Sequence, residues 1–175
     1  MFEEVDISSI VINPPAEFGK KWMLLTAGNK DKGYNTMTIA WGHMGAIWDM
    51  HRHVNPLPTL VCYVRPQRYT KKLIDSERMF SLSSLSEGYK KTLLYLGSHS
   101  GRDGDKISAT GLTPTFSDGT TYFAEAETVY ICRKIYQAPI KEEYFIDHEI
   151  VDFNYPAKDF HDMYIGEIVK VLKKA

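Results

Sequence analysis

The sequence has 175 residues, of which 43% are hydrophobic, and a formal net charge of -1. This length and composition fit one globular domain over residues 1–175 and argue against a disordered chain. The small net charge excludes a global basic field for nucleic acid, so any anion-binding site must be local.

Targeting and redox signals are weak. No apolar run approaches the roughly 20 residues that a membrane helix needs, so no membrane partner is expected. Met1–Ile12 has no basic start followed by an apolar block and is not a signal peptide. Cys62 and Cys132 lie far apart in strand-like runs, which indicates neither a disulfide framework nor a zinc site. We therefore expect a cytoplasmic protein.

The first half of the chain predicts strands joined by hairpins, after an N-terminal leader that crosses the surface and closes at Pro14–Pro15. Lys21–Ala27 predicts a buried strand, and a turn rich in Gly, Asn and Asp leads from it into Gly33–Trp41. Gly42–Pro58 predicts a long connection, of a length that is usually functional or covers a site. Thr59–Val64 predicts the next strand.

The second half continues with strands and a few short helices. The elements it predicts, in chain order, are a helix at Arg68–Glu77, a strand at Met79–Leu85, a helix at Glu87–Leu96, a loop at Ser98–Lys106, a long β-rich run at Thr121–Ile135, an irregular stretch at Ala138–Lys158 and a last strand at Met163–Leu172. Strands outnumber helices, and no β-α-β alternation is present. The pattern predicts a mainly β protein, an antiparallel barrel with a few covering helices.

The stretch Gly33–Trp41 alternates with the period of a half-buried strand. Met37, Ile39 and Trp41 share one face, and the other positions carry small or polar side chains. Such small groups leave room for a flat molecule to approach the backbone. We expect this strand to line a site for a planar, anionic ligand.

Arg68 and Thr70 lie where the first predicted helix begins. Free backbone N–H groups and the helix dipole favour an anion at such a position, and an arginine with a hydroxyl makes a plausible phosphate site. The alternative, that Thr70 only caps the helix and Arg68 is a solvated surface charge, stays open from the sequence alone.

Other motifs point to no specific chemistry. Gly97–Lys106 lacks the spacing of a nucleotide loop, and Ile107 occupies a position where a calcium loop needs a ligand, so spacing alone favours a structured turn. His43, His51 and His53 have no nearby carboxylate or cysteine at a metal-site spacing, so no metal is expected. No catalytic triad or paired-carboxylate signature is present, and an enzyme of this sequence would take its chemistry from a cofactor.

Taken in order, several motifs resemble those of the flavin reductase-like proteins with an FMN-binding split β-barrel, and particularly flavoredoxin-type members. The segments that carry the resemblance are Asn35–Trp41, Arg65–Thr70, Ser100–Lys106, Gly111–Pro114 and Tyr164–Val169. Together they span roughly Trp22 to Leu172 in the order typical of the family.

The resemblance implies a homodimer that holds FMN near the subunit interface and uses NADH or NADPH as electron donor. The residues that it assigns to the cofactor are Asn35, Thr36, Met37, Thr38, Ala40 and Trp41 around the isoalloxazine, Arg68, Tyr69 and Thr70 at the ribityl phosphate, Arg65 beside them, and Ser100, Gly101, Asp103 and Lys106 closing the pocket. His161 matches a family histidine near the nicotinamide or substrate, and is the predicted catalytic residue. Two departures, the long Gly42–Pro58 connection and Ser83 in place of a common Asn, concern substrate choice more than flavin binding.

Three functions remain open at this point. The first is an FMN-dependent NAD(P)H:flavin oxidoreductase that passes electrons to free flavin or another acceptor. The second is a flavoredoxin-like electron carrier with tightly bound FMN and little NAD(P)H turnover, and the third is a flavin-binding protein without turnover. Flavin and a nicotinamide nucleotide are the expected small-molecule partners.

Overall fold

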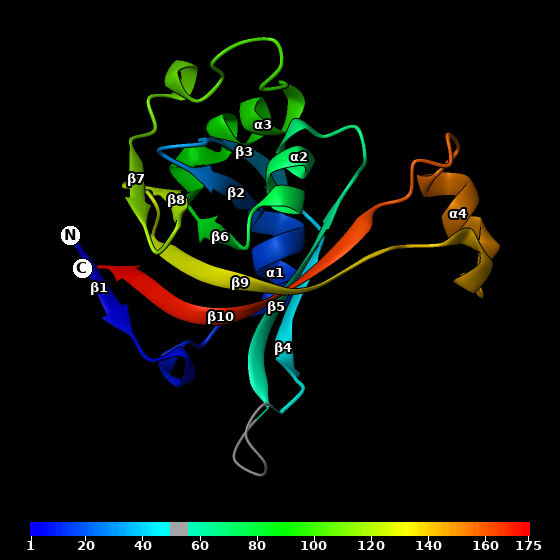
Figure 1. Ribbon diagram of the computed structural model, residues 1–175, viewed down its shortest axis with the longest axis horizontal. Helices are drawn as coiled ribbons and strands as arrows, with labels where there is room; N and C mark the ends of the chain where they lie inside the picture. Colours follow the sequence, from blue (N-terminus) through cyan, green and yellow to red (C-terminus); the bar gives the residue numbers. More distant parts are fainter. Residues whose placement is uncertain (50–55) are drawn as a thin grey trace.

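The computed structural model describes residues 1–49 and 56–175 (Figure 1). The strands are β1 Phe2–Val5, β2 Met23–Asn29, β3 Gly33–Ile39, β4 Gly42–Ile47, β5 Leu57–Val64, β6 Met79–Ser84, β7 Pro114–Ser117, β8 Thr120–Phe123, β9 Thr128–Pro139 and β10 Asp162–Lys174. The helices are α1 Pro14–Ala16, α2 Tyr69–Ser76, α3 Lys90–Ser98 and α4 His148–Asn154, and a wider helical turn at Glu17–Lys21 continues α1.

The main sheet is antiparallel and follows the order β3-β2-β6-β9-β10-β5-β4. Strand β10 is long enough to serve two neighbours on one edge, because Asp162–Glu167 pairs with β5 and Val171–Lys174 pairs with β1. Its other edge pairs with β9. The sheet thus divides beyond β10, and β7 and β8 form a separate hairpin. The prediction of a mainly β, antiparallel split barrel with a few helices is confirmed.

The core follows from the two-residue period of the strands. In β9, Tyr130 and Cys132 face the main apolar cluster, whereas Val129 and Ile131 face a second one. Burial of each large apolar side chain contributes roughly 1.5–3 kcal/mol before entropy is subtracted. In β10, Gly166 permits close packing, since a Cβ there would lie 2.5 Å from Cζ of Phe80.

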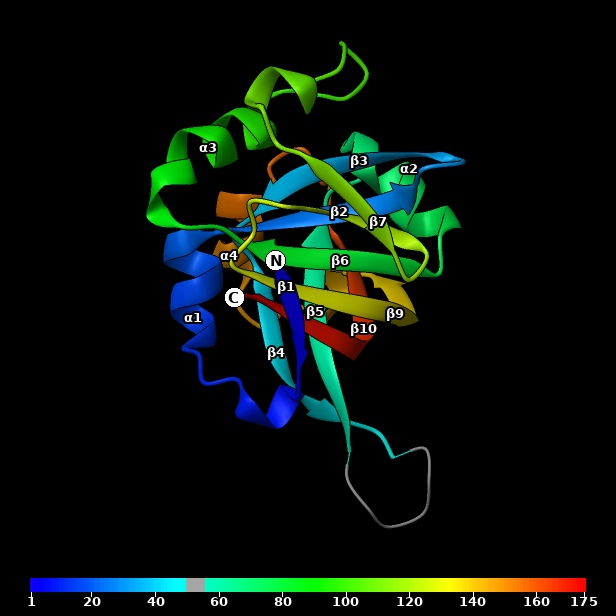
Figure 2. The same ribbon diagram turned by 90° about the vertical axis from the view of Figure 1, so that its left-hand side faces the viewer.

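The helices cover the barrel unevenly. Figure 2 shows α1 and α3 together on one side of the strands, with α2 near the end formed by β2 and β3. In contrast, α4 stands away from the barrel beyond the ends of β9 and β10 (Figure 1). The two termini lie side by side, where the Ala175 N–H donates to the Met1 carbonyl oxygen at 3.0 Å.

The prediction that Gly42–Pro58 forms one long connection is wrong at both ends of this segment. Gly42–Ile47 forms β4, which pairs along its whole length with β5, and β5 itself begins at Leu57. Pairing with a neighbour overrides the weak strand propensity of a segment rich in Gly, Ala and His. His51 and His53 lie outside the described residues.

Three further predictions need correction. Thr121–Ile135 is not one run, because residues 124–127 separate β8 from β9. Ala138–Lys158 is not wholly irregular, since α4 forms there with the Asp147 side chain accepting from the Glu149 N–H at its start. The N-terminal leader does not only cross the surface: β1 joins the edge of the sheet beside β10.

Candidate functional site

Five segments meet at one end of the barrel: β3, the end of β5, the start of α2, the loop at 98–106, and the residue before β10. Two clefts lie between them. The first, here the α2 cleft, has a volume of about 120 Å³, and the second, the β3 cleft, has about 200 Å³. Met37 and Arg68 line both clefts, so the two adjoin at these residues and are together called the groove.

The groove gathers most of the residues that the sequence assigned to a cofactor. Those in the α2 cleft are Asn35, Met37, Arg68, Tyr69, Thr70, Ser100, Gly101 and Lys106. Those in the β3 cleft are Met37, Thr38, Ala40, Trp41, Arg65, Arg68 and His161. Segments separated by up to 126 positions in the chain, from Asn35 to His161, are thus brought to one surface.

Two assigned residues line neither cleft. Asp103 is exposed in the loop, and its N–H donates to the Ser100 carbonyl oxygen. Thr36 is fully buried, and its hydroxyl donates to the Leu25 carbonyl oxygen at 3.1 Å and lies 2.9 Å from the Thr26 hydroxyl. Its side chain therefore holds strands together and leaves no open surface for a ligand.

The hydroxyl-bearing face of β3 differs from the sequence expectation. The Thr38 hydroxyl donates to the Leu93 carbonyl oxygen of α3 at 2.5 Å, and a Cβ at Gly97 would lie 3.3 Å from Cβ of Thr38. Helix α3 thus covers part of the face on which we expected a flat molecule to lie. The open groove is lined more by Met37 and by the end of the strand at Ala40–Trp41.

The α2 cleft is held in shape by close packing of three segments. The Asn35 amide donates to the Thr70 hydroxyl at 2.7 Å, which ties β3 to the first turn of α2. Gly101 packs against both, since a Cβ there would lie 2.5 Å from Oδ1 of Asn35 and 2.8 Å from Cδ1 of Tyr69. Only glycine allows the loop to approach this closely.

The α2 cleft carries positive charge. Arg68, Arg102 and Lys106 line it, and no carboxylate is among the described residues of its lining. Lys106 is 6% exposed, and its ammonium donates to the carbonyl oxygens of Leu96 and His99. Burial, and then the nearby Arg68 guanidinium, lower the pKa of Lys106 to about 8. Cations held together without a counter-charge favour an anionic ligand.

The start of α2 adds further donors. Arg68 occupies the N-cap position but makes no capping hydrogen bond with its side chain. Its guanidinium instead donates to the Gly97 carbonyl oxygen at 3.0 Å, across the cleft. The first amides of a helix have no intrahelical partner, so those of Tyr69 and Thr70 remain available to an anion.

The β3 cleft ends at an aromatic pair. The rings of Trp41 and His161 lie 4.7 Å apart between centroids, and His161 is buried whereas Trp41 is 43% exposed. Nδ1 of His161 lies 2.9 Å from the Tyr155 hydroxyl. Burial lowers the pKa of His161 to about 4, and the Arg65 guanidinium acts in the same direction. The imidazole is therefore neutral at pH 7.

Arg65 is held by other protein groups. Its guanidinium pairs with the Asp159 carboxylate at 2.5 Å and donates to the Asn154 carbonyl oxygen at 2.7 Å. It also lies over the Tyr155 ring, 5.3 Å from the centroid. Hydrogen bonds from Gln67 and Arg65 hold the pKa of Asp159 below its usual value. Arg65 thus supports the His161 end of the groove, whereas Arg68 and Lys106 supply its free positive charge.

Sequence reasoning missed several lining residues. Those in the α2 cleft are Gln67, Leu96, Ser98, His99 and Arg102, and those in the β3 cleft are Ile39 and Tyr63. Gln67 and Arg102 belong to segments that the sequence had singled out, so position within those segments was an available signal. No signal in the sequence indicated the contact of Tyr155 with His161, because Tyr155 lies in the stretch that we expected to be irregular.

Two further findings bear on the class of protein. None of the described helices is long and apolar enough to cross a membrane. Within residues 1–49 and 56–175, no group of three or more His, Cys, Asp or Glu side chains could hold a metal ion.

The model of the family described as flavin reductase like domain matches residues 16–174. Since this match spans most of the sequence, the chain belongs to the flavin reductase-like family, as its motifs predicted. A search of curated proteins gave no significant match.

Solved structures support the same fold. Flavoredoxin of Desulfovibrio vulgaris (Miyazaki F) is similar at 22% identity and a TM-score of 0.65, over 97% of this chain and 77% of that one. An FMN-binding domain of a flavin reductases-like enzyme from Shewanella baltica OS155 is similar at 15% identity and a TM-score of 0.65, over 99% and 77%. An NADH:FAD oxidoreductase from Streptomyces globisporus C-1027, in complex with NAD and FAD fragments, is similar at 13% identity and a TM-score of 0.60, over 88% and 75%. At these identities the likeness establishes the fold.

Proposed function

We propose that the protein is an FMN-binding oxidoreductase that takes electrons from NADH or NADPH and passes them to free flavin or another acceptor. The observation that carries the proposal is the pair of adjoining clefts, which is cationic at the α2 cleft and aromatic at the β3 cleft. FMN has a phosphate at one end, which suits the cationic α2 cleft, and a planar ring at the other, which suits the aromatic β3 cleft. Family membership and similar structures named for FMN binding support the same assignment.

In this proposal the phosphate lies in the α2 cleft. Arg68 offers a planar fork of donors, and Lys106 has one ammonium proton beyond the two that reach Leu96 and His99. The Ser100 hydroxyl and the first amides of α2 complete the donor set. A phosphate there would replace repulsion between Arg68 and Lys106 with attraction to both.

The ring lies in the β3 cleft against Met37 and the backbone of Thr38–Ala40, with Trp41 and His161 at the far end. FMN, once bound, supplies the reversible uptake of a hydride. The residues of the chain bind it, orient the donor and exclude water. Because Nδ1 of His161 is engaged by Tyr155, Nε2 is the atom left to hold the donor's carboxamide.

Two experiments test this function. Titration of the purified protein with FMN, followed by flavin fluorescence, should give saturable binding of one FMN per chain. Anaerobic mixing of the loaded protein with NADH or NADPH should then bleach the flavin absorbance band. Absence of saturable binding would remove the FMN site, whereas binding without bleaching would remove the nicotinamide reaction.

The second candidate is an electron carrier that holds FMN tightly and reacts poorly with nicotinamide. It is favoured by similar structures that are named flavoredoxin, from Desulfovibrio vulgaris and Methanosarcina acetivorans. Reduction of the loaded protein by dithionite but not by NADH or NADPH would support it over the first.

We also propose that the protein is a homodimer. The segment around α4 stands off the barrel, and Tyr144, Ile146 and Phe153 on it are 73%, 99% and 87% exposed. Large apolar groups exposed together are characteristic of interfaces. Light scattering of the FMN-loaded protein should give twice the mass of one chain, and a monomer would contradict the proposal.

A further inference from the structure

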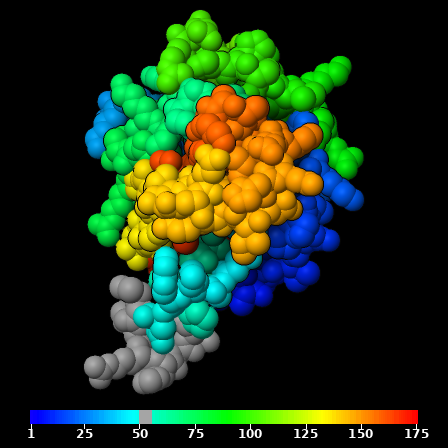
Figure 3. Space-filling view, turned by 90° about the vertical axis from the view of Figure 1, so that its right-hand side faces the viewer, coloured from blue at the N-terminus to red at the C-terminus, as the bar shows by residue number. Residues whose placement is uncertain are grey.

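A third and larger cavity lies next to the groove, on the side away from α2. Here called the α4 pocket, it has a volume of about 700 Å³. Its walls come from the α1 segment, from β4 and from the segment around α4. In Figure 3 this segment, in yellow to orange, lies beside the cyan β4 region and the blue N-terminal segment. Clefts of 300–1,000 Å³ are typical of sites for small organic molecules.

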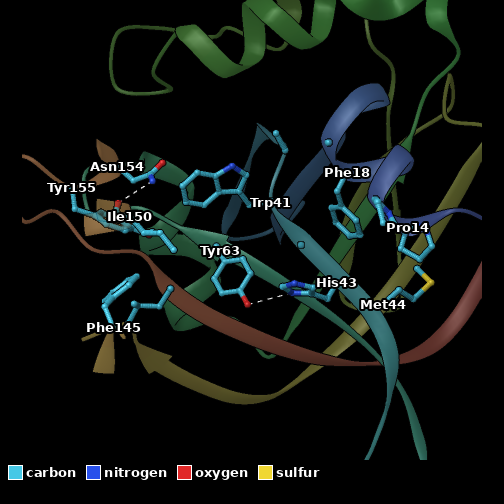
Figure 4. Close-up of a pocket in the computed structure, with 15 residues that line it drawn as sticks. Pro14, Phe18, Trp41, His43, Met44, Tyr63, Phe145, Ile150, Asn154 and Tyr155 are labelled. Atoms are coloured by element: carbon cyan, nitrogen blue, oxygen red, sulfur yellow. Dashed lines mark hydrogen bonds between the residues drawn. The ribbon is translucent and has the colours of Figure 1, made fainter. Parts of the chain in front are cut away.

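The walls of the α4 pocket are apolar and largely aromatic. Phe18, Met44 and Phe145 surround it from three separate segments, and Trp41 forms its inner side (Figure 4). No Asp, Glu, Lys or Arg is among the described residues that line it. A charged ligand would lose its hydration there without a partner, so the pocket suits an uncharged molecule.

Polar side chains interrupt the apolar lining at Asn154, whose amide donates to the Ile150 carbonyl oxygen at 2.9 Å, and at a Tyr63–His43 pair. The Tyr63 hydroxyl lies 3.3 Å from Nδ1 of His43, as the dashed line in Figure 4 marks. Burial raises the pKa of Tyr63, so its phenol keeps its proton and can donate. A contact of this length is weak, and a ligand oxygen can replace either partner at little cost.

The α4 pocket borders the β3 cleft. Ala40, Trp41 and Tyr63 line both spaces, so these residues form a shared wall between them. A molecule in the α4 pocket would lie beside whatever occupies the β3 cleft.

We propose that the α4 pocket binds a small, uncharged, mainly aromatic molecule whose single carbonyl or hydroxyl oxygen bonds to the Tyr63–His43 pair. The proposal rests on the proposed function only for the identity of the neighbouring molecule, which would be the flavin ring. The uncharged lining makes the pocket unsuitable for the phosphates of a nicotinamide dinucleotide.

Equilibrium dialysis with three probes, 1-naphthol, naphthalene-1-sulfonate and naphthalene, tests the binding. The protein is used as the full chain, both saturated with FMN and free of it, and FMN affinity is measured separately. 1-Naphthol should bind saturably, with one molecule per chain, in both forms. Naphthalene-1-sulfonate, which has a similar size but a charge, should bind at least about tenfold more weakly. Loss of FMN binding with 1-naphthol binding intact would count against the flavin site alone.

Variants then locate the site. Ile150→Glu introduces a carboxylate into the lining at a residue that is 46% exposed, and should abolish 1-naphthol binding. Leu94→Glu is the matched control, since it is also a half-exposed apolar residue of a helix (54% exposed) and is outside the lining. Tyr63→Phe should weaken 1-naphthol by roughly two- to tenfold and leave naphthalene unchanged, because only the former can use the hydroxyl.

Each opposite result overturns the proposal. Absence of saturable 1-naphthol binding to the wild type would contradict the proposal. A second copy of the chain that covers the pocket would give this result. Equal binding to the wild type and to folded Ile150→Glu would place the probe elsewhere. If Ile150→Glu does not fold, judged by circular dichroism, the Tyr63→Phe comparison decides: an equal effect on 1-naphthol and naphthalene contradicts the assigned polar contact.

Discussion

The Tyr155 hydroxyl lies 2.9 Å from Nδ1 of His161, with both residues buried, His161 in the lining of the β3 cleft and Tyr155 in that of the α4 pocket. The two rings meet edge to face, 5.6 Å apart between centroids, and the imidazole also lies 4.7 Å from the Trp41 ring between centroids. The hydroxyl can donate to this nitrogen or accept from it, so the contact holds the orientation of the neutral ring in either tautomer. Tyr155 is thus a positioning residue for the predicted catalytic His161.

Tyr155→Phe should slow reduction of bound flavin by NADH or NADPH roughly two- to tenfold, because it removes a hydrogen bond worth about 0.5–1.5 kcal/mol. His161→Ala should slow it further, since the donor loses its contact and its alignment. FMN affinity should stay unchanged in both. Stopped-flow reduction of the loaded variants measures the effect, with Tyr136→Phe, at a 43% exposed tyrosine that lines neither cleft, as control. A wild-type rate and donor affinity in His161→Ala would exclude His161 from the site.

The buried imidazole also predicts how stability depends on pH. His161 has a pKa of about 4 in the folded protein against an ordinary 6.5, so the unfolded chain takes up this proton first as pH falls. The free energy of unfolding should therefore be highest above pH 6.5 and fall between pH 6.5 and 4, by a few kcal/mol at most. The carboxylates with lowered pKa, such as Asp75 and Asp159, act below this range.

Urea unfolding at a series of pH values measures this effect. His161→Gln should flatten the dependence between pH 6.5 and 4. The same slope in His161→Gln as in the wild type would mean that other groups account for the loss of stability.

Arg68→Ala should weaken FMN far more than riboflavin. A charge-assisted hydrogen bond contributes roughly 1.5–3 kcal/mol, which corresponds to about ten- to hundredfold in affinity. Riboflavin lacks the phosphate and should be nearly unaffected. Fluorescence titration with both ligands measures the difference, and Arg78→Ala, at an exposed arginine outside both clefts, is the control. Equal losses for FMN and riboflavin would make Arg68 structural.

Local patterns were sufficient for part of the fold. The hairpin of β2 and β3 was predictable because Gly28 and Gly33, with φ of 93° and 84°, flank a turn of polar residues. The helix predicted at Arg68–Glu77 forms at Tyr69–Ser76, and Arg68 and Glu77 are its N-cap and C-cap residues. In both cases the signal lies within a few residues of the structure that it specifies.

Non-local contacts explain what sequence reasoning missed. Gly42–Ile47 becomes a strand only because β5 lies beside it, and Tyr155 reaches His161 only because the chain turns back at Pro156–Phe160. The contacts of the Thr36 hydroxyl with β2 could not be predicted for the same reason. Hydrophobic periodicity and composition indicate which residues can face a site. Contacts with residues that are distant in the sequence determine which of them do face it.

Lys106 provides the sharpest test of the phosphate position. Its pKa of about 8 results from burial and from the Arg68 guanidinium, and a phosphate dianion beside it would favour the charged form and raise that pKa. At a pH slightly above 8 the free protein holds Lys106 partly deprotonated, so FMN binding should take up protons there. The phosphate itself contributes none, because its second pKa is about 6.

Calorimetric titration in two buffers with different ionisation enthalpies measures this proton uptake. We expect uptake with FMN but not with riboflavin, and none for either ligand in Lys106→Met. Lys72→Met, on the exposed side of α2, should behave as the wild type. Uptake should fade as the pH is lowered towards 6.5, where Lys106 is already protonated in the free protein, since its pKa there is about 8. Equal uptake with riboflavin would place the titrating group away from the phosphate, and no uptake with FMN would remove Lys106 from the phosphate site.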